Sequence, residues 1–149
     1  MKTPFDVAVE VLRRRTDEIR IAIASAADQL TEIKDAQVTL AAAIRNERAL
    51  AASQLELPSA AYLARLDGAR ERLICDEQRY EAKLSLLREQ ALESHASLKA
   101  VEGAAQSFAV EADRVADIAE QASFDDITST RFSRSIRLMR APQERLRAS

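Results

Sequence analysis

The stretch IRIAIASAADQLTEIKDAQVTLAAAI, residues 19 to 44, decides the fold. Ile19, Ile23, Ala26 and Leu30 follow one another at alternating steps of four and three residues, and charged residues occupy positions beside them. An apolar heptad of this kind places its members along one side of an α-helix, where they pack against a partner helix. The stretch therefore predicts one helix of a coiled coil.

The same spacing extends in both directions and predicts a helix over residues 4 to 56. Thr3 is expected to cap it, with Pro4 at the first helical position and Asp6 at the third, close to a capping box. The predicted seam, the row of residues that faces the partner helix, is Phe5, Val9, Leu12, Thr16, Ile19, Ile23, Ala26, Leu30, Ile33, Gln37, Leu40, Ile44, Glu47 and Ala51.

Leu57, Pro58 and Ser59 interrupt the pattern. Proline disfavours helix in the residue before it, and serine is a good N-cap, so a turn at 57 to 59 is expected, with a kink in one continuous helix as the alternative. A second helix is expected from 60 to about 139, with one step of four in place of three before Leu84. Its predicted seam is Tyr62, Leu66, Ala69, Leu73, Asp76, Tyr80, Leu84, Leu87, Ala91, Ser94, Leu98, Val101, Ala105, Phe108, Ala112, Val115, Ala119 and Ala122.

Two amphipathic helices joined by a short turn predict an all-α fold, a long antiparallel coiled-coil hairpin in a single domain. The first helix is shorter, so the second is expected to overhang it beyond about residue 110, with Phe5 near Phe108 and Ile44 near residues 69 to 73. The seam continues past that point through Val115. An apolar stripe without an intramolecular partner favours an intermolecular one.

The composition agrees with long helices and offers little for catalysis. The 149 residues include only two Gly and three Pro, and 4% of them are aromatic. His95 and Cys75 are the only His and Cys, so we expect no catalytic residue, no cofactor and no metal site within one chain. A single cysteine and the lack of a long apolar run predict a cytoplasmic, non-enzymatic protein.

The C-terminal stretch RFSRSIRLMR, residues 131 to 140, is basic in a chain whose formal net charge is −2. On a helix, Phe132, Ile136 and Met139 share one face, and the remaining arc carries the arginines. Residues 123 to 130 are expected to weaken or break the helix, Pro142 to end it, and residues 141 to 149 to be disordered. The arginines of this stretch are Arg131, Arg134, Arg137 and Arg140.

Several interpretations of this basic end remain open. It could dock on an acidic protein partner, lie on an anionic membrane surface, bind nucleic acid, or be a solvated, frayed end. Docking on a protein is favoured because it uses both the arginines and the unpaired apolar stripe. No nucleic-acid-binding signature accompanies the arginines, and membrane association is expected to be peripheral at most.

The opening residues Phe5, Val11, Leu12 and the arginines at 13 to 15, together with FDDITSTRFSR at 124 to 134, are similar to the flagellar export protein FliJ family. The resemblance implies a non-catalytic stalk of the bacterial flagellar type III export apparatus, cytoplasmic and peripheral at the inner membrane. It implies three partners: the hexameric export ATPase, the export gate membrane protein and export chaperones. The chain would be a monomer or would self-associate weakly.

In that family an aromatic residue followed by apolar residues early in the second helix contacts the export gate. The residues here that match this stripe are Tyr62, Leu66 and Ala69, with Leu73 next along. All four are also predicted seam residues, so packing inside the hairpin is the favoured alternative.

Overall fold

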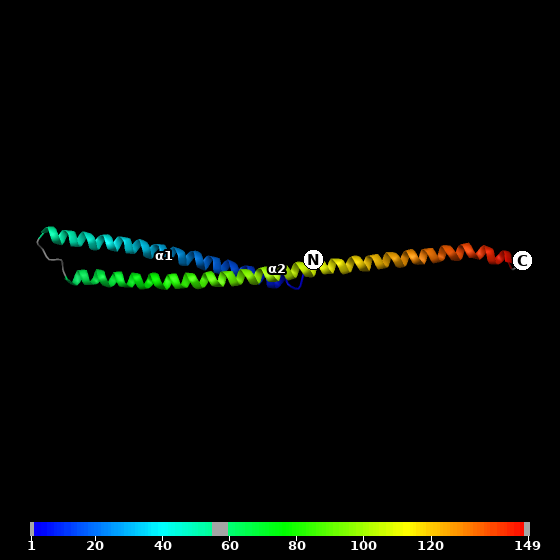
Figure 1. Cartoon of the computed structure of the whole chain (residues 1–149), viewed down its shortest axis with the longest axis horizontal. Helices are drawn as coiled ribbons and strands as arrows, with labels where there is room; N and C mark the ends of the chain where they lie inside the picture. The colour runs from blue at the N-terminus through cyan, green and yellow to red at the C-terminus, as the bar shows by residue number, and fades with distance from the viewer. Residues whose placement is uncertain (1, 55–59, 148–149) are drawn as a thin grey trace. The chain divides into compact units, whose positions relative to one another are not determined.

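The chain folds into two α-helices, and the computed structural model describes residues 2–54 and 60–147. Helix α1 spans Asp6–Gln54 and helix α2 spans Ala60–Arg147. The two helices pack against each other as an antiparallel hairpin (Figure 1), and no strand occurs within the described ranges. The predicted all-α hairpin is confirmed. The turn expected at 57 to 59 lies outside the described residues.

The start of α1 is held by reciprocal contacts between Thr3 and Asp6. The backbone N–H of Thr3 donates to the Asp6 carboxylate at 2.8 Å, and the Thr3 hydroxyl donates to its other oxygen. The backbone N–H of Asp6 donates in turn to the Thr3 carbonyl at 3.2 Å. The hydroxyl and amide of Thr3 lower the pKa of Asp6 below its ordinary value, because both stabilise the charged form. The carboxylate half of a capping box is therefore present.

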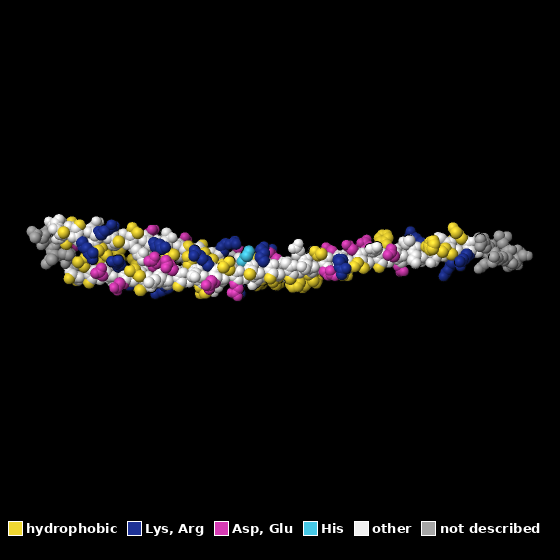
Figure 2. Space-filling view, viewed as in Figure 1, with side chains coloured by type: hydrophobic (Ala, Val, Ile, Leu, Met, Phe, Trp, Pro, Cys, Tyr) yellow, Lys and Arg dark blue, Asp and Glu magenta, His cyan; other side chains and the backbone are white. Residues whose placement is uncertain are grey.

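The predicted seam is the buried side of α1 and of α2 from Leu66 to Ala105. All fourteen of its residues from Phe5 to Ala51 are buried or half-buried, and so is every seam residue of α2 from Leu66 to Ala105. Most residues between them are exposed, and Figure 2 shows charged side chains scattered over the visible face of the hairpin. The exposed members of the predicted α2 seam are Tyr62, Phe108, Val115, Ala119 and Ala122. The most buried apolar side chains are Ile19, Ala26, Ile44, Leu84 and Leu98.

Three polar residues of the seam, Thr16, Gln37 and Ser94, make hydrogen bonds across the hairpin. The hydroxyls of Thr16 and Ser94 lie 3.0 Å apart, and the Gln37 amide donates to the Glu77 carboxylate at 2.7 Å. The position nearer the start of α1 pairs with the position further along α2, as antiparallel helices require. A polar pair at a single level of a seam disfavours other registers, because sliding would leave its groups without partners.

The chain divides into two units. The hairpin unit runs from Val7 to Val101, and the second unit contains the residues before Val7 together with α2 from Glu102 onward. In the second unit the rings of Phe5 and Phe108 meet edge to face, with centroids 6.0 Å apart and planes at 71°. This is the contact expected at the end of the overlap between the helices.

Helix α2 continues without interruption through residues 123 to 130 and past Pro142. The break considered for residues 123 to 130 is absent from α2. Within the helix the Thr130 hydroxyl donates to the Asp126 carbonyl at 2.8 Å and the Ser135 hydroxyl to the Arg131 carbonyl at 3.1 Å. The helix also extends beyond the end expected at about 139, because α2 reaches Arg147, whereas the disorder expected for 141 to 149 stays a prediction. A proline removes one backbone hydrogen bond, which the helix here tolerates.

The two glycines of α2 do not serve close packing. A Cβ added at Gly68 or Gly103 would meet no atom within 4 Å. Neither position is therefore reserved for a residue without a side chain.

Candidate interaction surfaces

The candidate sites among the described residues are exposed surfaces. The described residues contain no group of three His, Cys, Asp or Glu side chains placed to hold a metal ion. Cys75 is exposed, and so is His95. Neither α1 nor α2, over its described length, contains a segment apolar enough to cross a bilayer.

The basic end of α2, residues 131 to 140, is exposed to solvent except at Ile136, which is half-buried. Phe132 and Met139 keep 66% and 75% of their accessible surface. Within the described part of the chain the four arginines make no ion pair, so their charge is available to a partner. The structure thus brings together on one helical segment the seven residues predicted to bind a partner there: Arg131, Phe132, Arg134, Ile136, Arg137, Met139 and Arg140.

An acidic segment precedes the basic end on the same helix. Its acidic residues are Glu111, Asp113, Asp117, Glu120, Asp125 and Asp126, and its one base is Arg114. Arg114 donates to both oxygens of Glu111, at 2.7 and 3.0 Å. This pairing lowers the pKa of Glu111 and raises that of Arg114, because each charge stabilises the other. From Asp113 to Arg140, every residue except Ile136 is exposed.

The stripe proposed to contact an export gate lies in the hairpin unit. Tyr62 is exposed, whereas Leu66, Ala69 and Leu73 are half-buried. Ala69 and Leu73 line one groove together with Leu40 of α1. Three of the four residues therefore belong to the packing of the hairpin, and Tyr62 is the one that offers a free surface.

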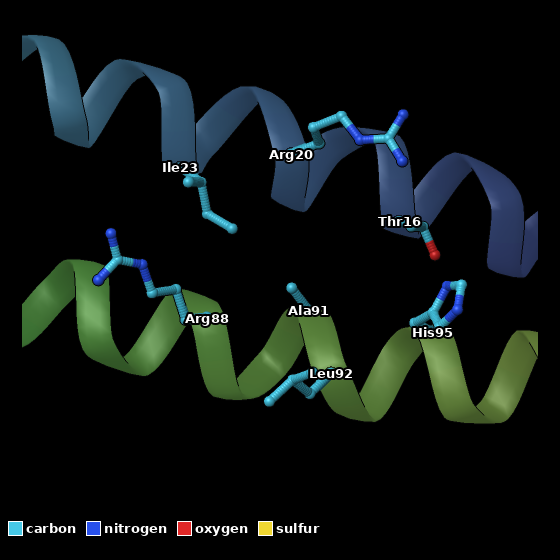
Figure 3. A pocket seen from close by; sticks show the side chains of 7 residues that line it. All are labelled: Thr16, Arg20, Ile23, Arg88, Ala91, Leu92 and His95. Carbon is cyan, nitrogen blue, oxygen red and sulfur yellow. The ribbon is translucent and has the colours of Figure 1, made fainter.

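A groove lies between the helices of the hairpin unit (Figure 3) and has a volume of about 480 Å³. The apolar part of its lining comes from Ile23, Ala91 and Leu92. Three basic side chains and one hydroxyl complete the lining: Arg20, Arg88, His95 and Thr16. In Figure 3, His95 and Thr16 point toward one another from opposite helices.

The sequence pattern missed this groove. Leu92 keeps 74% of its surface, and His95 lies one residue after the buried Ser94. The signal was present in the small Ala91, which leaves a gap at a seam position where most neighbours are larger. The Thr16 hydroxyl is occupied by the Leu12 carbonyl at 2.9 Å and by Ser94, so it is satisfied without a ligand.

The comparisons with known proteins add no relative. A scan against protein-family models found no match, and neither did searches of the curated proteins and of the solved structures. Function therefore has to be argued from the surfaces themselves.

Proposed function

We propose that the chain is a non-catalytic coiled-coil stalk of the flagellar type III export apparatus. In this proposal the basic end of α2 docks on an acidic surface of the hexameric export ATPase. The observation that carries it is the exposed basic end itself, four arginines that form no ion pair with any described residue and that lie around the side chains of Phe132 and Met139. The protein would work in the cytoplasm, peripheral at the inner membrane, and would carry out no reaction of its own.

The charge and the apolar face have separate roles in such docking. Exposed arginines accelerate the approach to an acidic surface, and salt weakens that effect. Burial of Phe132 and Met139 after contact slows dissociation, because the apolar surface then leaves water. A long unbroken helix supports this role, since its hydrogen-bonded turns present both groups on one rigid element.

The resemblance to the FliJ family supplies the identity of the proposed partners. Besides the ATPase, they are the export gate membrane protein and export chaperones. For the gate, Tyr62 is the residue that remains free to make the contact, because Leu66, Ala69 and Leu73 are half-buried in the hairpin.

The test is binding to the purified export ATPase and stimulation of ATP hydrolysis. We expect a variant with all four arginines of the basic end changed to Gln to associate more slowly, and Phe132→Ala to dissociate faster. Two matched control variants carry the same kinds of substitution at other positions of the chain. Phe124→Ala removes another exposed phenylalanine of α2, and the second control changes four exposed arginines of the hairpin unit, Arg45, Arg48, Arg65 and Arg70, to Gln.

The proposal fails if the wild-type chain does not bind the ATPase, or if both test variants bind as the wild type does. Retention of nucleic acid, or of anionic lipid vesicles, by the wild type and not by the four-arginine variant would instead identify the chain as a binder of anionic surfaces. Equal losses in the two four-arginine variants would reduce the charge effect to net charge alone, and equal losses in Phe132→Ala and Phe124→Ala would contradict a contact made by Phe132.

A further inference from the structure

The uncovered part of α2 carries two apolar rows that meet on one face. Val115, Ala122 and Ile136 fall at heptad spacing, and so do Ile118, Phe132 and Met139. Residues that share a heptad position line up along a helix, and these two positions are adjacent around it. Ser129 and Asp125 occupy the middle of the respective rows. The face is therefore apolar at both ends and polar at its centre.

This face has no cover within the described chain. Val115 and Ile118 keep 55% and 53% of their surface, and Phe132 and Met139 keep still more. The row of Val115 continues the seam position of Phe108, which already packs on Phe5. The row of Val115 therefore continues along α2 from a residue that already makes an apolar contact in this unit.

Charge along the same segment is divided into two blocks. Residues 111 to 126 contain six acidic side chains and one arginine, and residues 127 to 141 contain four arginines and no acidic residue. Two copies of the segment side by side in parallel would place like charges at the same level. In antiparallel order, each acidic block lies level with the basic block of the other copy. Most of these charges lie on the outer sides of the two helices, so the attraction acts over a distance and is weakened by salt.

We propose that residues 111 to 141 of two chains pair with each other as an antiparallel coiled coil. A second copy fits the face better than an unrelated helix, because one sequence supplies both the complementary charges and the complementary apolar ends. The pairing centres on residue 127. The inference is independent of the proposed function, since it concerns the chain alone.

The spacing of the rows fixes which residues meet. In an antiparallel coiled coil, the two core positions alternate across the pair, so each layer joins one member of each row. Layers through this face place Val115 opposite the second copy's Met139, Ile118 opposite its Ile136, and Ala122 opposite its Phe132. The central layers join Asp125 to Ser129, which leaves the carboxylate beside a hydroxyl.

Pairing would hide the surface proposed to bind the ATPase, because Phe132, Ile136 and Met139 serve both contacts. Self-association and docking would then exclude each other. A chain paired with a second copy would have no exposed apolar end and could not dock on the ATPase.

The geometry is tested by disulfide formation between single-cysteine proteins. Cys75→Ser removes the native thiol, and Ile118→Cys and Ile136→Cys are each introduced alone in that background. We expect a covalent dimer when the two proteins are mixed and oxidised, and little from either alone. Ile127→Cys is the control, since it lies near the centre of the pair on the opposite side of the helix. Linking of Ile118→Cys with itself would indicate parallel pairing and overturn the proposal.

The charge argument is tested by sedimentation of two variants. One changes the four arginines at 131, 134, 137 and 140 to Glu, and the other changes Asp113, Asp117, Glu120 and Asp126 to Lys. Each alone is expected to be monomeric, because both of its blocks then carry one sign, whereas an equal mixture should form a dimer that dissociates in high salt. A wild type that stays monomeric at the highest soluble concentration, or a mixture that does not dimerise, would overturn the proposal. These measurements need no ATPase, so their failure is distinct from a failure of the proposed function.

Discussion

Leu84 and Leu86 lie two residues apart on α2 and differ in burial, which makes them a direct test of the seam. Leu84 keeps 6% of its surface and Leu86 keeps 55%. Leu84→Ala removes three carbon groups from a buried site, which corresponds to about 2.4 kcal/mol at about 0.8 kcal/mol per group. The seam is one layer thick and can relax, so we expect a loss of about 2 to 3 kcal/mol, at the low end for such substitutions.

Leu86→Ala makes the same chemical change at a mainly exposed site, and we expect a loss of about 1 kcal/mol or less. The free energy of unfolding would be measured by urea titration followed by circular dichroism, with both variants at one protein concentration. Equal losses would refute the assignment of Leu84 to the seam. Leu84 is also the residue that follows the extra step of four, so the same result would place that step wrongly. The pair Leu98→Ala and Leu92→Ala repeats the test away from that step, with exposures of 8% and 74%.

Three further results are expected. Gly68→Ala and Gly103→Ala should each raise the free energy of unfolding by about 0.5 to 1 kcal/mol, since alanine favours helix and no atom obstructs its Cβ; a loss in thermal denaturation would contradict this. Thr16→Val alone should cost about 1 kcal/mol, because it leaves the buried Ser94 hydroxyl without its partner, and adding Ser94→Ala should recover part of the loss. Asp6, whose pKa lies below its ordinary value of 3.8, should support the start of α1 fully above that pH and lose its effect as pH falls through the lowered pKa. The melting-temperature gap between wild type and Asp6→Ala should therefore close in acid, and a gap that widened there would count against the Thr3 contact.

The heptad pattern predicted the fold because it is local and repeats many times. A single misplaced residue, such as Gln37 in the seam, does not disturb a row of fourteen. The step before Leu84 was also visible, since Tyr80 and Leu84 are both large and both lie on the packed side. Contacts that depend on two helices at once were harder to predict. Glu77 lies outside the seam, and only the register that brings it to Gln37 gives it a partner.

The continuity of α2 could not be predicted from helix propensity. Thr128, Ser129 and Thr130 are poor helix formers, yet the Thr130 hydroxyl bonds to a carbonyl of its own helix. The bond satisfies the hydroxyl inside the helix, and intrinsic propensity is too weak a preference to decide the continuity of a long helix. The basic end could be identified from the sequence. The acidic segment before it became relevant only because α2 is unbroken, which places both segments on one helix.

The thinness of the hairpin core has a consequence for how the molecule opens. None of the described side chains retains less than 2% of its surface, so every layer of the seam borders water. Each layer also touches only the layer before it and the layer after it, which lets the pair separate from an end one turn at a time. Amide hydrogen exchange should therefore slow gradually from the ends of the overlap toward the region of Ile19, Ala26 and Leu84. Amides of α2 beyond Asp113 should exchange at the rate of an isolated helix, unless a partner covers them.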